Sequence, residues 1–466
     1  MNNYQHNAEL FLQKADYEAL TGEANGNLIA FKNFTYVPRK AEMLPGFMSD
    51  KMLAQAQDPA DSSLYLHIPF CNLRCTYCGF YREHFSKEQV ERYVQALLQE
   101  LELWYNKGVL RQRKIKAVFF GGGTPSVLNA QQIRALLAKI HGIASLSEDC
   151  EITFESSLYD IDESKIQACL EGGVNRFSFG VQTFDTGLRR SIGRTGSCDE
   201  VRAKLKGIAQ YDATIIVDLI YGLPGQNTEM LLRDIDLALD CGVSGMDLYK
   251  LQIMPKSPLG QALAAKKIVY EQTEENLWQM FLAADSYLQQ RGVSAISCCH
   301  WASRPREQSV YNTLVKNGTD ILACGCSCGG RLGRYQFMKT FKREDYQEKI
   351  MQGKAPIMGI SKNPLSYNFL EQLSGQVDKG FLNFALLPDM DGANWEQLLQ
   401  PLLEKWLKLG LLQRSAESYI LTARGKFYYK YLDRILLTMV EFILHGPLGM
   451  FEAAGQKMLG AMKNLK

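Results

Sequence analysis

The chain has 466 residues, of which 46% are apolar, so it can bury a sizeable core in one large domain with satellites or in two or three domains. Its 52 basic and 50 acidic residues leave a net charge of +2, which argues against a protein that binds nucleic acid mainly through charge. Twelve cysteines without an N-terminal export signal indicate reduced thiols or metal ligands rather than a disulfide framework.

The sequence predicts a cytoplasmic protein without a membrane span. Met1 is followed by NNYQHNAELF, which has neither the basic region nor the apolar region of a secretory signal. The longest apolar run near the C-terminus, residues 435–444, is too short to cross a bilayer and contains Glu441. A core helix is therefore expected there.

Residues 1–60 are expected to form an N-terminal extension, after which short β-branched or aromatic runs alternate with amphipathic segments. The predicted strands are residues 63–68, 115–123, 151–157, 175–182, 213–225 and 245–255. The first predicted helix begins near residue 86, and the others cover residues 131–140, 162–171, 199–209, 228–240 and 273–290. The first helix is expected to start with a capping box formed by Ser86 and Gln89.

This rhythm predicts an α/β fold with parallel strands and right-handed crossovers. Polar residues recur where the strands end, in GGGT, FESS, GVQ and DLIYG, and barrel enzymes build their sites at that edge. A partial (β/α)6 barrel over residues 61–300 is therefore favoured over a doubly wound sheet. Residues 301–350 are predicted to form a connecting segment near the substrate or SAM. Residues 351–466 are predicted to form a mainly helical, winged-helix-like domain. Because that domain shows no basic recognition face, DNA binding is not favoured.

Three cysteines, Cys71, Cys75 and Cys78, lie directly after the first strand in a C-x3-C-x2-C spacing. A structural zinc site usually needs four protein ligands, and a redox C-x-x-C pair would leave Cys71 unused. A [4Fe-4S] cubane normally takes one thiolate on each iron, so three cysteines leave one iron open to a small molecule. The spacing therefore favours a [4Fe-4S] cluster whose open iron binds a small molecule directly.

This spacing resembles that of the radical S-adenosylmethionine (SAM) family. The segments YLHIPFCNLRCTYCGF, FFGGGTPS, FGVQTF and DLIYGLPGQ, in this order, are similar to the branch that contains oxygen-independent coproporphyrinogen III oxidase and the haem chaperones. The resemblance implies one [4Fe-4S] cluster on the three cysteines and SAM, in two molecules. It also implies a set of SAM-binding residues: Tyr65, Tyr77, Gly122, Gly123, Thr124, Glu155, Gln182, Arg194 and Asp218.

Departures from the family pattern indicate which branch is closest. The coproporphyrinogen oxidases have a fourth cysteine where this chain has Phe80, and of the chaperones' H-N-x-x-Y-W haem motif only Tyr311 and Asn312 remain. The segments SCCHWASRP and ACGCSCGGRLGRYQFM instead resemble the haem-utilisation radical SAM methyltransferases, the anaerobilin synthases. That resemblance implies anaerobic opening of the haem ring, with methyl transfer from SAM and release of iron and a linear tetrapyrrole.

The implied partners are haem or a related tetrapyrrole, an electron donor such as flavodoxin or a reductase, and a carrier protein for haem or product. A haem chaperone and a coproporphyrinogen oxidase-like enzyme remain the alternatives. No nucleic-acid partner is expected.

Several further residues are candidates for contacts with haem. His300 could ligate the iron or donate a proton, although a hydrogen-bonded structural histidine is the commoner role. Arg304, Arg306 and Arg331 could pair with propionates or simply be solvated. Cys324, Cys326 and Cys328 would share one face if they lay in a single strand. We interpret these cysteines as small residues beside a ligand rather than as a second metal site.

Overall fold

The computed structural model describes residues 2–13, 42–44, 60–79 and 85–463. Most of the predicted N-terminal extension and Phe80 therefore lie outside the described residues. The chain divides into a barrel unit, residues 43–315 and 319–362, and a C-terminal unit that contains residues 363–466, 316–318 and the first helix. The domain boundaries predicted at residues 60, 300 and 350 stay predictions.

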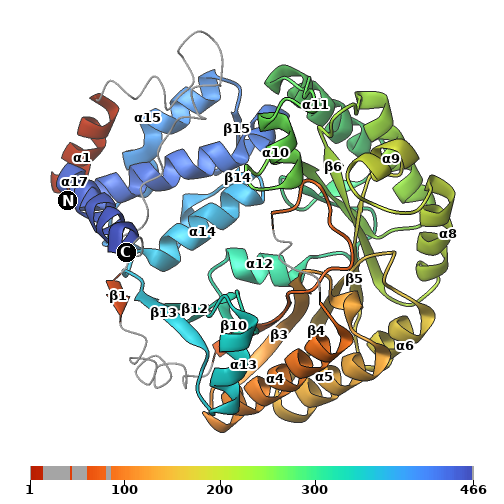
Figure 1. The fold of residues 1–466 in the computed structure, drawn as a ribbon. Coiled ribbons are helices and arrows are strands. Elements are labelled where there is room, and N and C mark those ends of the chain that lie inside the picture. Colours follow the sequence, from red (N-terminus) through yellow and green to blue (C-terminus); the bar gives the residue numbers. More distant parts are fainter. Residues whose placement is uncertain (1, 14–41, 45–59, 80–84, 464–466) are drawn as a thin grey trace. The chain divides into compact units, whose positions relative to one another are not determined.

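Six parallel strands form the centre of the barrel unit and are neighbours in chain order, as predicted (Figure 1). They are β2 (Ala60–Ile68), β3 (Arg113–Gly122), β4 (Ser145–Ser156), β5 (Arg176–Gln182), β6 (Thr214–Tyr221) and β7 (Gly245–Lys250). β9 (His300–Ala302) pairs antiparallel with β7, and β8 (Ser294–Ala295) pairs with β9. This confirms the α/β class.

The sheet continues on the other side of β2. β10 (Asp320–Cys324) is parallel to β2, and the strands β11 (Gly329–Leu332), β12 (Tyr335–Lys339) and β13 (Ile357–Lys362) follow in antiparallel order. β1 (Glu42–Leu44) ends the sheet at this side and β8 ends it at the other. Because the two end strands are not paired with each other, the barrel is open.

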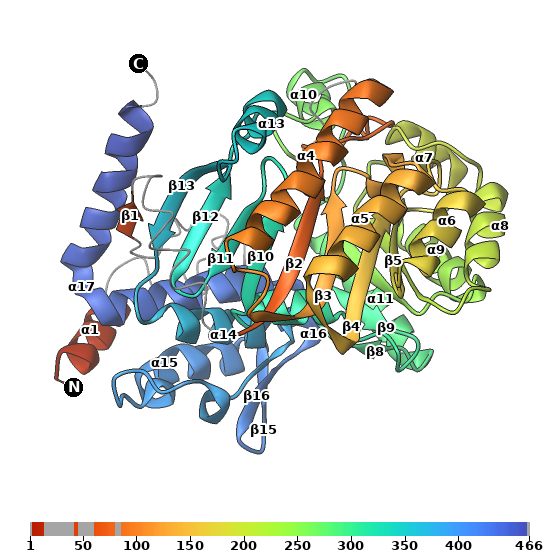
Figure 2. The same cartoon turned by 90° about the horizontal axis from the view of Figure 1, so that it is seen from below.

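Helices cover the outer face of the sheet (Figures 1 and 2). The helices of this unit are α4 (Lys87–Asn106), α5 (Ala130–Ile143), α6 (Glu163–Glu171), α7 (Thr186–Ser191), α8 (Cys198–Ile208), α9 (Thr228–Asp240), α10 (Pro258–Ala264), α11 (Glu274–Gln290), α12 (Val310–Lys316) and α13 (Arg343–Met351), with the 3-10 turn η4 (Pro125–Val127). Of these, α12 lies on the inner side of the sheet, where its Tyr311 stacks on Phe119 of β3 (Figure 1). The predicted capping box of Ser86 and Gln89 is present at the start of α4.

The two faces of the strands differ in chemistry because successive side chains alternate. On the helix-covered face of β6, Ile215, Val217 and Leu219 are at most 1% exposed. Asp218 lies on the opposite face, beside Asp247 of β7 in the register. The concave face of the sheet is therefore where polar side chains gather.

The C-terminal unit is mainly helical, as predicted. It contains α1 (Asn2–Gln13), α14 (Tyr367–Asp378), α15 (Trp395–Lys408), α16 (Ala423–Phe427) and α17 (Tyr429–Lys463), with η5 (Phe384–Leu386) and the strands β14 (Phe381–Leu382), β15 (Leu412–Ser415) and β16 (Ser418–Leu421). The helix–hairpin–helix order from α15 to α16 is the predicted winged-helix-like pattern. Asn7 of α1 donates to the carbonyl of Ile443 in α17 at 2.9 Å.

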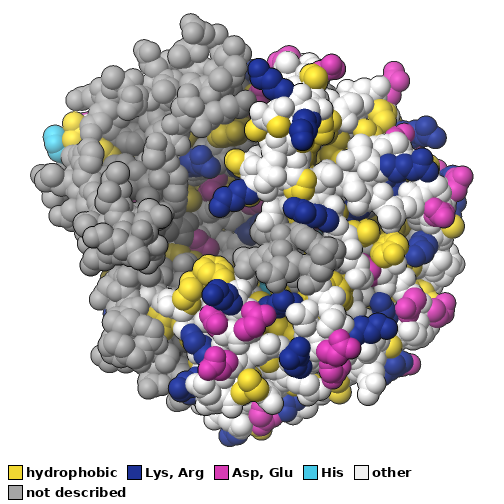
Figure 3. Space-filling model, viewed as in Figure 1, with side chains coloured by type: hydrophobic (Ala, Val, Ile, Leu, Met, Phe, Trp, Pro, Cys, Tyr) yellow, Lys and Arg dark blue, Asp and Glu magenta, His cyan; other side chains and the backbone are white. Residues whose placement is uncertain are grey.

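The apolar run at residues 435–444 is a buried part of α17, which confirms the expected core helix. The helix is interrupted at Gly446, whose φ is 65°. Among the described helices, none has an apolar segment that would reach across a bilayer. On the face drawn in Figure 3, Lys and Arg side chains are interspersed with Asp and Glu side chains over the described residues.

Candidate active site

The three cysteines lie in the loop that leaves the carboxyl end of β2. The end of α7 and the start of α10 hold its backbone in place: Thr76 donates to the carbonyl of Ile192 at 3.0 Å and accepts from the amide of Leu259 at 2.8 Å. Gly193 has a φ of 76°, and a Cβ there would lie 2.6 Å from the carbonyl oxygen of Arg74. The loop that carries the thiols is therefore packed tightly before any ligand binds.

Cys75 is buried, whereas Cys71 and Cys78 are half-buried, and all three are free thiols. Burial raises the pKa of Cys71 to about 11, although the hydroxyl of Thr124, which donates to its sulfur at 3.3 Å, acts in the opposite direction. Among the described residues, no three His, Cys, Asp or Glu side chains converge as the ligands of a single metal ion must. In a cubane each thiolate binds a different iron, so its ligands need not converge in this way.

The glycine-rich segment after β3 packs directly against this loop. Gly123 and Thr124 donate their amides to the carbonyls of Ile68 and Phe70, each at 2.7 Å. A Cβ at Gly123 would lie 2.5 Å from the oxygen of Phe70, so only glycine allows this approach. Gly122, with a φ of 109°, leaves space for the ring of His67 in the same way.

Arg194 and Gln182 lie together on the other side of the cysteine loop. Arg194 is within 3.4 Å of the hydroxyl of Tyr77, and its Nε is buried without a hydrogen-bond partner among the described residues. Gln182 ends β5 in the left-handed region, with a φ of 71°. A Cβ at Gly180 would lie 2.7 Å from Gln182 Nε2 and 2.9 Å from the Arg194 guanidinium. An orphaned guanidinium nitrogen beside a strained residue indicates a ligand site.

Two carboxyl groups face the inside of the barrel, Glu155 from β4 and Asp218 from β6. Glu155 accepts from the amide of Gly122 at 3.3 Å, and Asp218 accepts from the hydroxyl of Ser178 at 3.4 Å. Burial raises the pKa of Glu155 to about 7. Burial, together with the negative charges of Asp247 and Glu155, raises the pKa of Asp218 to about 8. Both groups would ionise readily if a cation bound between them.

His300 lies deeper in the barrel, between two carboxylates. Its Nδ1 is 2.9 Å from Asp247 Oδ1 and its Nε2 is 3.1 Å from Glu307 Oε1, and Arg176 is 3.0 Å from Glu307 on the far side. Burial lowers the pKa of His300, but Asp247 and Glu307 outweigh burial and raise it to about 9. Both ring nitrogens therefore lie beside a carboxylate, although only Nε2 makes a hydrogen bond among the described residues, and ligation of iron by His300 would require one of these contacts to break.

The sequence interpretation missed Asp247, which joins Asp218 to His300. Its signal was visible, because Asp247 stands in the strand GMDLYK among apolar residues just as Asp218 does in TIIVDLIY. Only the register between β6 and β7 places the two carboxyl groups side by side.

Aromatic rings line the barrel wall at its first two strands. Tyr311 stacks on Phe119 with ring centroids 4.4 Å apart, and Tyr65 lies 6.3 Å from Tyr311. The hydroxyl of Tyr65 is 3.1 Å from Nδ1 of His67. Tyr65 thus belongs to the wall of the barrel, whereas Tyr77 lies in the cysteine loop itself.

Comparisons with known proteins agree with this geometry. The Radical SAM superfamily model matches residues 65–238. The chain is 32% identical to the anaerobilin synthase of Escherichia coli O157:H7 over 399 residues, which cover 85% of this chain and 88% of that protein. The chain belongs to the radical SAM superfamily. Its haem-related branch is the one that the sequence resemblance indicated, and that prediction is confirmed.

Other relatives fall in the same branch. The Heme chaperone HemW of Escherichia coli K12 is 27% identical over 394 residues, which cover 80% of this chain and 98% of that protein. The structure of the coproporphyrinogen III oxidase of Escherichia coli superposes with a TM-score of 0.73 at 21% identity, covering 88% of this chain and 98% of that one. That likeness confirms the predicted fold: a radical SAM barrel with a helical C-terminal domain.

Members of the radical SAM superfamily use a [4Fe-4S] cluster and SAM, and this confirms the predicted cofactors. The free thiols of one packed loop, the buried Nε of Arg194 and the close approach at Gly123 fit such a pair of groups. The assignment of individual residues, and of a second SAM molecule, stays a prediction.

The three later cysteines do not lie in a single strand, so they lack the shared face that one strand would give them. Cys324 ends β10, and the chain then turns at Gly325 and Ser327, which have φ of 109° and 62°. Cys326 donates its amide to the hydroxyl of Tyr93 at 3.0 Å, and the thiol of Cys328 lies 3.1 Å from the carbonyl of Gly325. Two positive φ values reverse the chain, which a sequence of small residues did not reveal.

The candidate arginines lie away from the cysteine loop. Arg306 pairs with Asp212, which precedes β6, and the backbone of Arg304 donates to the carbonyl of Ser244, which precedes β7. Both are therefore at the amino ends of the parallel strands, opposite the cysteines. Arg331 is 5% exposed and its guanidinium donates to the carbonyls of Val315 and Thr319. These positions give no support to the predicted pairing with propionates.

Proposed function

We propose that this protein is a radical SAM methyltransferase that opens the haem ring under anaerobic conditions. It would transfer a methyl group from SAM and release iron and a linear tetrapyrrole, as a step in haem utilisation. The observation that carries the proposal is the likeness to anaerobilin synthase, which extends over 85% of the chain at 32% identity and so includes the region beyond the barrel core.

The proposed residue roles follow from the geometry of the barrel edge. Cys71, Cys75 and Cys78 would hold the cluster, which when bound supplies the electron that cleaves SAM. Arg194, with its unpaired Nε, is suited to a carboxylate of SAM. Glu155 and Asp218 are suited to its positive charge or to its ribose hydroxyls.

The remaining residues of the interior would position the substrate and exclude water. The stacked rings of Tyr65, Phe119 and Tyr311 offer a flat apolar surface of the kind on which a porphyrin can pack. His300, held between Asp247 and Glu307, is proposed to hold a proton near the reaction rather than to bind iron. Flavodoxin or a reductase would supply electrons, and a carrier protein would accept haem or product.

A haem chaperone is the second candidate. It is favoured by the likeness to Heme chaperone HemW, of which 98% is covered, whereas the loss of the chaperone motif except for Tyr311 and Asn312 speaks against it. An oxidase of the coproporphyrinogen type is less well supported, because Phe80 replaces the fourth cysteine.

One experiment separates these candidates. We expect protein with a reconstituted cluster, given SAM, a low-potential reductant and haem without oxygen, to bleach the porphyrin absorption. Mass spectrometry should find one SAM-derived methyl group in a linear tetrapyrrole when labelled SAM is used. Haem that stays intact while bound would favour the chaperone instead.

SAM should bind more tightly as pH rises from 6 to 8. Without ligand, Glu155 and Asp218 are protonated up to about pH 7 and 8, and the cationic ligand favours their ionised forms. Binding therefore releases protons below these pH values, and the dissociation constant should fall by up to about tenfold per pH unit for each group. Titration calorimetry at pH 7 in buffers of different ionisation enthalpy measures the release.

Asp218→Asn is the matched variant for this pH dependence. It removes the group with the higher pKa, so the affinity for SAM should level off near pH 7 instead of pH 8. An affinity in the wild type that does not change between pH 6 and 8 would contradict the proposed contact of SAM with these two carboxyl groups.

A further inference from the structure

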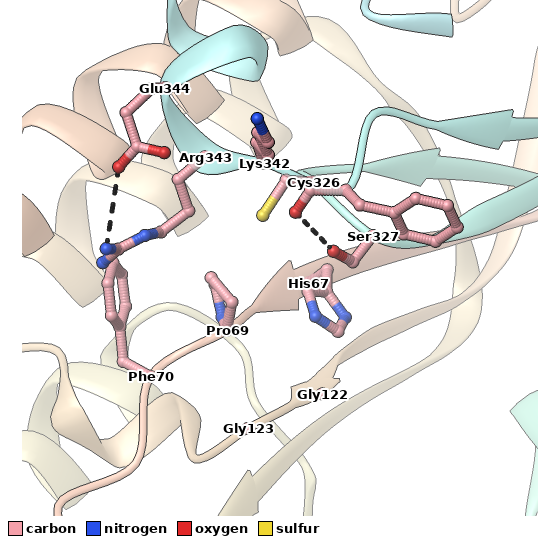
Figure 4. Close-up of a pocket in the computed structure, with 11 residues that line it drawn as sticks. His67, Pro69, Phe70, Gly122, Gly123, Cys326, Ser327, Lys342, Arg343 and Glu344 are labelled. Carbon is pink, nitrogen blue, oxygen red and sulfur yellow. Dashed lines mark hydrogen bonds and ion pairs between the residues drawn. The ribbon is translucent and has the colours of Figure 1, made fainter. Parts of the chain in front are cut away.

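A cavity of about 290 Å³ opens beside the cysteine loop, within the barrel unit. Figure 4 shows it between the end of β2 and the residues that follow, with His67, Pro69 and Phe70, and the start of α13, with Lys342 and Arg343. Its volume is at the lower end for small-molecule sites, so it would hold part of a large ligand rather than a whole macrocycle.

The topology puts this cavity at the same edge as the cysteines. β12 runs parallel to β2, because β10 is parallel to β2 and two antiparallel pairings follow. Lys342 and Arg343 follow the carboxyl end of β12, as Cys71 follows the carboxyl end of β2. Gly123, which packs against Phe70 just before Cys71, also lines the cavity, as does Gly122. Its basic residues are thus near the proposed SAM site, unlike Arg306.

The charges on the cavity wall leave one cation in excess. Arg343 is 3.7 Å from Glu344, and its guanidinium lies over the ring of Phe70 at 5.4 Å. The Lys342 ammonium, by contrast, makes no ion pair with any carboxylate among the described residues. The wall that carries these residues is held in place by Ser327, whose amide donates to the carbonyl of Thr340 and whose hydroxyl donates to the carbonyl of Phe341.

We propose that Lys342 and Arg343 bind a carboxylate, namely a propionate of the tetrapyrrole, in this cavity. The proposal rests on the proposed function, which supplies a substrate with two propionates. Two adjacent cations and an aromatic ring match a carboxylate on a short apolar chain. The carboxylate of SAM has the same chemistry, so the test must tell the two apart.

Binding of haem and of haem dimethyl ester to protein with a reconstituted cluster, followed by absorption, tests the proposal without turnover. The wild type should bind haem about tenfold more tightly than the uncharged ester, since solvent screens the exposed lysine. In Lys342→Gln/Arg343→Gln the two ligands should bind equally, at the affinity of the ester. Arg306→Gln, which removes a cation at the opposite edge, should keep the tenfold difference.

Three results would overturn this assignment. The wild type could bind haem and the dimethyl ester equally, or the double variant could still bind haem more tightly than the ester. The third is a double variant in which the affinity for SAM falls while the affinity for haem is unchanged. Because Lys342 is exposed, Lys342→Gln alone serves if the double variant does not fold. Haem that binds with the expected discrimination but is never opened would refute the proposed enzyme and leave the propionate site standing. Opening of the haem ring by a wild type that binds haem and the ester equally would support the proposed enzyme and refute the propionate site.

Discussion

Cys75→Ala should abolish SAM cleavage and lower the iron content of the purified protein. Cys75 is the buried member of the three thiols, and a cubane left with two protein ligands is poorly retained. We expect the yield of 5′-deoxyadenosine to fall at least about a thousandfold, to background, because every later step depends on the cofactor. Iron and sulfide analysis, electron paramagnetic resonance of the reduced protein and chromatography of the products measure the effect.

Cys198→Ala is the matched control, since Cys198 is a half-buried thiol at the start of α8, outside the cysteine loop. It should keep full iron content and SAM cleavage. SAM cleavage that survives in Cys75→Ala would mean that the cluster is held elsewhere.

Lys339→Met should destabilise the barrel unit by about 3–5 kcal/mol. Lys339 and Glu100 form an ion pair in which both side chains are fully buried. Glu100 also accepts from the hydroxyl of Tyr346 at 2.7 Å, the amide of Gly325 at 2.8 Å and the indole of Trp104 at 3.1 Å. Without the lysine, a buried carboxylate would lose its counter-charge. A lower midpoint in guanidinium denaturation would show this.

Two further variants isolate the cause. In Glu100→Gln/Lys339→Met no charge is left unpaired, so the double variant should be more stable than Lys339→Met alone. Lys139→Met removes the lysine of a partly exposed pair with Glu102 and should change the stability by less than about 1 kcal/mol. If the double variant were as unstable as Lys339→Met, the loss of stability would come from the changed packing around residue 339 and not from an unpaired charge.

This buried pair also shows a limit of sequence reading. Glu100 lies within an amphipathic helix and Lys339 is 239 residues later, so nothing in their local patterns distinguishes them from solvated charges. The same holds for Arg176 and Glu307, which are paired across 131 residues. Long-range ion pairs are decided by where the elements meet, and spacing along the chain does not encode that.

The sequence by itself determined the order of the six parallel strands and of the helices between them, the α/β barrel class and the cysteine loop. Alternation of apolar residues and caps such as Ser86–Gln89 are local signals, and the cysteine spacing is one as well. Only the tertiary structure decided which polar groups meet. It brought Asp247 beside Asp218, turned the chain at Gly325 and put Lys342, rather than Arg306, at the cysteine edge. The physical reason is that strand register and direction set these neighbours, and both depend on pairing between distant segments.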